Sequence, residues 1–264
     1  MSSTTVHKKY VSKILKYLSK NQKLISEVII VIDPIKGLSA LRFRLRLRII
    51  LSGYKLKIPV HTILSPNRLY AGSARNHGWL RAKSDWVMFF DADDEYADSR
   101  FSIIADYIAL TPAANVFVHS YCTSGEEFSS LESLLTKKEM PKLISFESIK
   151  NATLQNLGLQ DNNVLFVPDP NGGFYPVHHG HLTVRRSIMS THMFPSTIKA
   201  EDTDFCRSVL FGAGGVFHIP LKLSRYHPLK SSWRNDPWPI EVYYYIKHQA
   251  KQLVIKFQRK PDLQ

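Results

Sequence analysis

The chain has 264 residues, of which 44% are hydrophobic and 11% aromatic, so a wholly disordered protein is excluded. Its 35 Lys and Arg outnumber its 22 Asp and Glu, and the net charge of +13 favours an anionic partner: a nucleotide, nucleic acid, acidic polymer or lipid surface. No stretch approaches ~20 consecutive apolar residues, so no membrane span is expected. The opening MSSTTVHKKYVSK lacks the apolar middle of a secretion signal, and we expect a cytoplasmic protein. Cys122 and Cys206 make neither a disulfide framework nor a zinc set.

The N-terminal part of the chain is predicted to contain a helix and a buried strand. Apolar residues recur at helical spacing over residues 8–20, and the β-branched run over residues 27–32 predicts a strand that Asp33 ends. Residues 42–48 alternate with period two, which by itself indicates an edge strand, but the surrounding apolar spacing and Gly53 also fit a helix. We favour the helix because a strand–helix–strand alternation surrounds it.

The same alternation continues along the chain. We predict strands near 58–63, 85–90, 115–119, 181–185 and 215–219, and helices near 71–83, 99–110, 202–211 and 239–258. Residues 123–162 interrupt the pattern with polar, weakly helical sequence and are interpreted as an insertion or a lid. This order predicts a single α/β domain over residues 1–264, with a mostly parallel central sheet flanked by helices.

The stretch WVMFFDADDEY (residues 86–96) places acids at the end of a buried strand. Ligands of open α/β sheets bind beyond the carboxyl ends of the strands, where Asp91, Asp93 and Asp94 are expected. Asp91 and Asp93 would point to the same side in extended backbone, and their charges would repel unless a cation lies between them. Mn²⁺ or Mg²⁺ suits such carboxylates. Alternatively, Asp93 or Asp94 caps the following helix.

The segment NRLYAGSARNHGWLRAKSDWVMFFDADDEY (residues 67–96) resembles the core of family 2 glycosyltransferases, which have the GT-A fold. The residues that match the family's helix and its Asp-x-Asp motif are Gly72, Ala74, Arg75, Asn76, Gly78, Ala82, Asp91, Ala92, Asp93 and Asp94. Further resemblances lie in EVIIVID (27–33), GHLTVRRSIM (180–189), AEDTDFCRSVLFGAG (200–214) and SRYHPLKSSW (224–233), whereas 123–162 lies outside the resemblance. The family pattern implies a nucleotide-binding half at about 1–120, an acceptor half at about 163–236 and a C-terminal helix at about 237–264.

The resemblance implies an inverting transfer of a sugar from a nucleoside-diphosphate sugar, with UDP as the expected nucleotide, to a hydroxyl of a glycan, glycolipid or protein. Asp93 and Asp91 would hold the Mn²⁺ or Mg²⁺ ion that neutralises the leaving diphosphate. His227 would join them at the metal, although a single His beside a Tyr is usually structural.

The donor-binding residues that the resemblance implies are Asp33, Arg75, Asp91, Thr5 and Lys230. Asp33 would accept a hydrogen bond from the base, or it merely ends the strand. Arg75 would bind phosphate or orient Asp91, or it forms a salt bridge within the fold. The opening MSSTTVHKK would supply a shortened first strand, in which Thr5 takes part in the base pocket.

Asp202 is the expected general base, with Glu201 holding an acceptor hydroxyl or tuning Asp202. The alternative is that both acids simply favour a helix N-terminus. The cluster HHGH (residues 178–181) fits no zinc motif. We interpret it as part of the acceptor or sugar pocket, through His181, with Trp233 as a second acceptor residue.

The C-terminal stretch DPWPIEVYYYIKHQAKQLVIKFQRK mixes aromatic and basic residues. It either contacts an anionic membrane surface peripherally or packs on its own domain. Two other functions stay open at this point: a metal-dependent nucleotidyltransferase and a non-catalytic glycan-binding relative. No nucleic-acid partner is expected, because the Glu201–Asp202 pair has a clear use in sugar transfer and none in two-metal phosphoryl chemistry.

Overall fold

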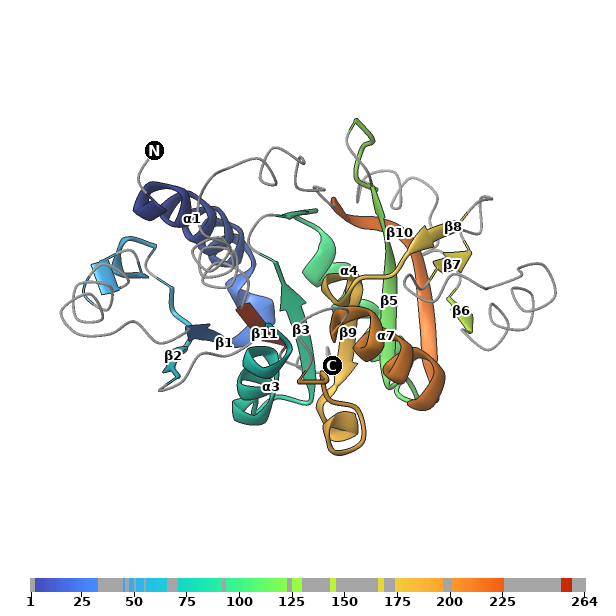
Figure 1. Ribbon diagram of the computed structural model, residues 1–264. Helices are drawn as coiled ribbons and strands as arrows, with labels where there is room; N and C mark the ends of the chain where they lie inside the picture. Colours follow the sequence, from blue (N-terminus) through green and yellow to red (C-terminus); the bar gives the residue numbers. More distant parts are fainter. Residues whose placement is uncertain are drawn as a thin grey trace, which may run out of the picture.

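The computed structural model describes residues 3–32, 45, 48–49, 51–54, 56–65, 71–91, 94–122, 125–129, 143–145, 166–168, 174–196, 201–225 and 253–257 (Figure 1). The α-helices with described bounds are α1 (Ser3–Asn21), α3 (Ala71–Arg81), α4 (Arg100–Leu110) and α7 (Glu201–Gly212), and the 3-10 turns are η1 (Gln22–Leu24), η2 (His179–His181) and η3 (Arg186–Ser190). The strands are β1 (Ile25–Ile32), β2 (Val60–Leu64), β3 (Trp86–Phe90), β4 (Glu95–Tyr96), β5 (Val116–Cys122), β6 (Ile144–Ser145), β7 (Phe166–Pro168), β8 (Phe174–Pro176), β9 (Leu182–Arg185), β10 (Val216–Arg225) and β11 (Leu253–Phe257).

One nine-stranded sheet organises the molecule, in the order β2-β1-β11-β3-β9-β5-β10-β4, with β6 also paired to β10. The pairs β1–β2 and β5–β10 are parallel, whereas β11 and β9 run antiparallel to both of their neighbours. The strands β2, β1, β3, β5 and β10 therefore share one direction. Their carboxyl ends meet at one edge of the sheet, where ligands bind in open α/β folds.

Most of the predicted elements are confirmed. The predicted helices near 8–20, 71–83, 99–110 and 202–211 are α1, α3, α4 and α7, and the predicted strands become β1, β2, β3, β5, β9 and β10. Residues 45, 48–49 and 51–53 are helical, which agrees with the favoured reading of that region. Within 123–162, β6 pairs with β10. That these residues form an insertion or a lid stays a prediction.

Two predictions at the chain ends are wrong. The expected first strand does not form, because residues 3–9 belong to helix α1, and Thr5 therefore lies in a helix. The predicted C-terminal helix is replaced at 253–257 by β11, which lies between β1 and β3 in Figure 1. A place between two strands gives the Leu-Val-Ile run ladder partners on both sides, and this tertiary pairing overrides its helical spacing. Residues 239–252 lie outside the described part of the chain.

The strand β3 explains why residues 86–90 carry no polar alternation. All five residues are buried, with Val87 and Phe89 in one core cluster and Trp86, Met88 and Phe90 in the other. Helices α3 and α7 contribute to the first cluster, and α1 and α4 to the second. Both faces of the sheet are thus covered, as a continuous apolar strand requires. None of the helices in the described residues combines the length and apolar character needed to cross a bilayer.

Gly72 lets the first turn of α3 approach the segment that leads to α7. A Cβ at this position would lie 2.8 Å from the Pro195 carbonyl oxygen and 3.0 Å from both Glu201 Cγ and Phe194 Cβ. Glycine is therefore required for close packing rather than for an unusual φ. This contact sets the distance between α3 and the N-terminus of α7.

We predict that Gly72→Ala lowers the free energy of unfolding. Overpacking typically costs about 1–3 kcal/mol, which exceeds the gain of up to about 1 kcal/mol in helix propensity. Gly53→Ala is the matched control, because nothing lies within 4 Å of a Cβ there. Urea unfolding measures the free energy of unfolding of both variants and of the wild type. A Gly72→Ala variant as stable as the Gly53→Ala variant would contradict the close-packing role of Gly72.

A second prediction concerns His119, a buried residue of β5. Burial, followed by the Arg100 charge, lowers the pKa of His119 well below 6.5, although its hydrogen bond to the Ser120 carbonyl opposes this. As the pH falls below the unfolded-state pKa of about 6.5, the unfolded chain gains a proton that the folded chain excludes, so stability falls.

The expected contribution is up to about 1.4 kcal/mol per pH unit below that pKa. His119→Gln should therefore show a shallower loss of unfolding free energy between about pH 6.5 and pH 5, by roughly one proton. Urea unfolding at several pH values measures this slope. Identical slopes in the two proteins would mean that His119 protonates freely in the folded state.

Candidate active site

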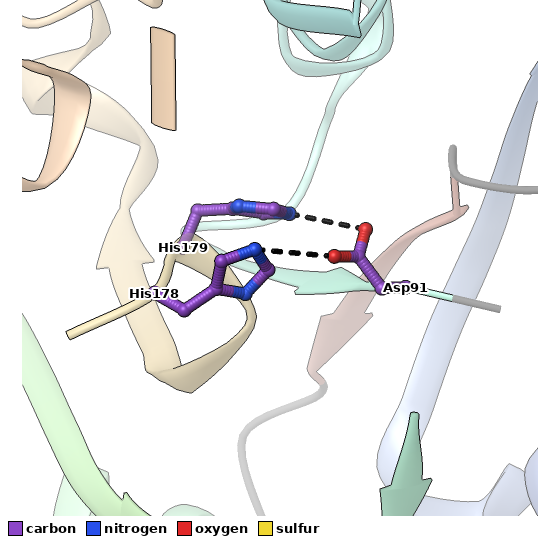
Figure 2. A group of neighbouring side chains, drawn as sticks. All are labelled: Asp91, His178 and His179. Atoms are coloured by element: carbon purple, nitrogen blue, oxygen red, sulfur yellow. Dashed lines mark hydrogen bonds and ion pairs between the residues drawn. The ribbon is translucent and has the colours of Figure 1, made fainter. Parts of the chain in front are cut away.

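Asp91 directly follows β3 and is the centre of a cluster of polar side chains. Its Oδ1 lies 3.2 Å from His179 Nε2 and 3.6 Å from Arg75 Nη2. Its Oδ2 lies 3.3 Å from His178 Nε2, so the two imidazoles approach different oxygens of one carboxylate, as Figure 2 shows. Both the Asp91 and the Arg75 side chains are only 3% exposed, so the ion pair is shielded from solvent.

The antiparallel strand β9 brings the histidines to this position. In the register of β9 against β3, Met88 lies opposite Thr183 and Trp86 opposite Arg185. The residues before β9 therefore lie beside the carboxyl end of β3. The turn η2 is then closed by hydrogen bonds from Gly180 N to His178 Nδ1 (3.3 Å) and from His178 N to His181 Nδ1 (3.2 Å).

Two further carboxylates enter the cluster from the first turn of α7. Glu201 Oε1 lies 3.4 Å from Arg75 Nη1, and Asp202 Oδ2 lies 3.4 Å from His178 Nε2. Arg75 and His178 thus each bridge Asp91 to one acid of α7. The cluster holds three carboxylates and one guanidinium, and a divalent cation would balance the remaining negative charge.

The helix α3 fixes the cluster through two consecutive residues. Arg75 supplies the guanidinium, and its Cζ lies 5.2 Å from the centroid of the Phe194 ring. Asn76 donates from Nδ2 to the Phe194 carbonyl (2.8 Å) and accepts at Oδ1 from the Phe194 amide (3.0 Å). Phe194 in turn stacks on Phe205 of α7 with ring centroids 3.7 Å apart. The Arg-Asn pair therefore holds α7 beside Asp91.

The site keeps His179 neutral and Asp202 ionised near neutral pH. Burial, then the charges of Arg75 and His178, lowers the pKa of His179 to about 3 despite the opposing influence of Asp91. Burial raises the pKa of Asp202, but His179, His178, Arg75 and the Thr203 amide together outweigh it and leave that pKa below its usual value. Near neutral pH, His179 is thus a neutral imidazole and Asp202 is a carboxylate.

Asp91, His178 and His179 have the chemistry of a metal-binding group. One potential ligand atom from each lies within 4.8 Å of the others. Two imidazole nitrogens and one carboxylate favour a transition metal over Mg²⁺. Metal binding through His178 Nε2 would move its proton to Nδ1 and give up the 3.3 Å contact with Gly180, a weak hydrogen bond at that length. The residues therefore fit a divalent cation.

The structure brings together four of the predicted site residues: Asp91, Arg75, Glu201 and Asp202. His181 is buried and stacks on Tyr121 with ring centroids 4.5 Å apart, so it supports the η2 turn rather than reaching Asp91. Five other predicted residues lie outside the described part of the chain, namely Asp33, Asp93, His227, Lys230 and Trp233.

Sequence reasoning missed the contact of His178 and His179 with Asp91. The signal was present, because the HHGH cluster immediately precedes the predicted strand near 181–185. It was not decisive, because nothing in the sequence states that β9 runs antiparallel beside β3. Only that pairing places the amino end of one strand beside the carboxyl end of the other.

Comparisons with known proteins agree with this geometry. Residues 44–174 match the family model described as glycosyl transferase family 2, a range that runs through residues 123–162. The comparison with curated proteins finds no match.

Solved structures of S. aureus TarS match the fold with 14% sequence identity and a TM-score of 0.54. TarS 1–349 is matched over 92% of this chain and 67% of TarS 1–349. Its complex with UDP-GlcNAc is matched over 91% of this chain and 61% of that chain, and its complex with UDP over 90% and 65%. This chain thus spans at most about two thirds of the TarS chains that it resembles. The family match in residues 44–174 and the shared fold together support a family 2-like glycosyltransferase with the GT-A fold.

Proposed function

We propose that the protein is an inverting, metal-dependent glycosyltransferase. Its donor would be a nucleoside-diphosphate sugar, with UDP as the expected nucleotide, and its acceptor a hydroxyl of a glycan, glycolipid or protein. The observation that carries this proposal is the convergence of Asp91 with Glu201 and Asp202 across Arg75 and His178. One carboxylate lies at the end of β3, where donors bind, and two belong to a different element.

The donor side of the reaction is assigned to the group around Asp91. Asp91, His178 and His179 would hold the cation, with Asp93 and His227 as the further ligands that the family resemblance implies. When bound, the ion would neutralise charge that develops on the leaving diphosphate. Arg75 holds Asp91 in place, because its fork reaches both Asp91 and Glu201.

The acceptor side is assigned to Asp202 as general base, with Glu201 beside it. The Asp202 side chain is 33% exposed, so a hydroxyl can reach it, whereas Asp91 is shielded. Its lowered pKa keeps it ionised at neutral pH and able to take a proton. Its position in the first turn of α7 also stabilises the helix, so both functions expected for this residue are compatible.

The first test replaces the base. Asp202→Asn should reduce release of nucleoside diphosphate from a cognate nucleotide sugar about 10²-fold or more, because proton removal is lost. Donor affinity should stay close to that of the wild type. The measurement is diphosphate release from a panel of nucleotide sugars in the presence of Mn²⁺.

The matched control is Asp204→Asn in the same helical turn. Its side chain is 49% exposed and pairs only loosely with Arg207 at 3.8 Å, so activity should be unchanged. Equal activity of Asp202→Asn and the wild type would overturn the assignment of the base. Pyrophosphate release from nucleoside triphosphates would instead indicate a nucleotidyltransferase. No release of product from any donor would indicate a glycan-binding relative.

The second test concerns the cation. Asp91→Asn and His179→Gln should each weaken Mn²⁺ binding about tenfold or more, as loss of a metal-site partner typically does. His192→Gln is the control, because its Nδ1 pairs with Ser208 Oγ at 2.8 Å away from the cluster. Electron paramagnetic resonance counts free Mn²⁺ in each titration. Wild-type affinity in both site variants would exclude this group as the metal site.

A further inference from the structure

We propose that Tyr96 and Arg100 form a positioning pair that fixes the arrangement of Asp91, His178 and His179. The inference rests on the proposed function, which gives this arrangement its use. Neither side chain is proposed to contact the metal ion or the substrate. Each instead binds the backbone on one side of the cluster, Tyr96 at Asp91 and Arg100 at Gly180.

Tyr96 controls the backbone on the carboxylate side. Its hydroxyl accepts a hydrogen bond from Asp91 N (2.8 Å) and donates one to Asp91 O (2.9 Å). Holding both polar groups of a single residue fixes its backbone orientation and, with it, the direction of its Cα–Cβ bond. Burial, followed by the charges of Asp94 and Asp91, raises the pKa of Tyr96 well above 10, so the hydroxyl keeps the proton that it donates.

Arg100 controls the backbone on the histidine side. Its Nη2 donates to the Gly180 carbonyl at 2.7 Å, within the η2 turn that directly follows His178. The side chain is completely buried, and its Nε and Nη1 have no hydrogen-bond partner among the described residues. Burying a guanidinium costs free energy, and the short bond to Gly180 and the two aromatic rings beside Arg100 offset part of that cost.

The two residues act together because they are stacked. Arg100 Cζ lies 4.7 Å from the centroid of the Tyr96 ring and 4.6 Å from that of Phe90, the last residue of β3. Arg100, the first residue of α4, is thereby joined to Asp91 through the Tyr96 ring. Its guanidinium joins it directly to the η2 turn at Gly180. A site of this kind requires its ligands to be held within about 0.5 Å, which explains a rigid support on both sides.

Tyr96→Phe is the sharpest variant, because it removes one oxygen and leaves the ring in place. Tyr17→Phe is its matched control. Tyr17 is also buried, its ring centroid lies 5.8 Å from that of Tyr96, and its hydroxyl donates one buried hydrogen bond to the Ala97 carbonyl at 2.9 Å. Both variants lose a buried hydroxyl from the same aromatic cluster, but only Tyr96 binds Asp91.

We expect Tyr96→Phe to weaken Mn²⁺ and UDP binding about tenfold or more, and to lower diphosphate release by about 10²-fold, the usual consequence of a misplacement near 1 Å. Tyr17→Phe should leave all three values within about twofold of the wild type. Arg100→Met should resemble Tyr96→Phe, and Arg100→Lys should recover part of the loss, because an ammonium can still donate to Gly180 O.

Crystal structures of the two tyrosine variants provide a readout that does not depend on activity. In Tyr96→Phe the Asp91 carboxylate should move by more than about 0.5 Å relative to His178 and His179, whereas Tyr17→Phe should leave it in place. An unmoved carboxylate in Tyr96→Phe overturns the positioning role, even if the enzyme is active. If the carboxylate moves in Tyr96→Phe but the wild-type protein has no transferase activity, the positioning role is supported and the proposed function is refuted.

Discussion

The buried ion pair between Arg75 and Asp91 is the interaction on which the site depends. Asp91 is shielded from solvent and lies near two other carboxylates, so without a guanidinium their mutual repulsion would favour protonation or separation. Arg75 offsets this repulsion and joins the end of β3 to the first turn of α7. The same side chain thus offsets the local negative charge and joins Asp91 to Glu201 at the start of α7.

The strand order supplies the remaining groups. Strand β9 runs antiparallel between β3 and β5, and this reversal delivers His178 and His179 to the carboxyl end of β3. A purely parallel sheet would have placed the residues before β9 at the opposite edge. Tyr96 of β4 and Arg100 of α4 then support the two sides, through the Tyr96 hydroxyl at Asp91 and the Arg100 guanidinium at Gly180.

Much of the fold and four residues of the site could be predicted from sequence, where the signal was local. Each of the predicted features lies within one element: the apolar run before Asp91 in β3, the Arg75-Asn76 pair in α3 and the acids in the first turn of α7. The rest depended on pairing between distant segments. Thr5 lies in a helix because α1 extends back to Ser3, and residues 253–257 form a strand instead of the predicted helix because β11 pairs between β1 and β3.

The central claim is that Asp91 anchors a cation that meets the nucleotide. A crystal soaked with Mn²⁺ and UDP tests it directly, through the anomalous difference map. The account predicts a manganese peak bonded to Asp91 and to at least one of the imidazoles of His178 and His179, with the diphosphate on its open side. A bound nucleotide with no peak at that carboxylate, and with the Arg75 ion pair unchanged, would contradict the account.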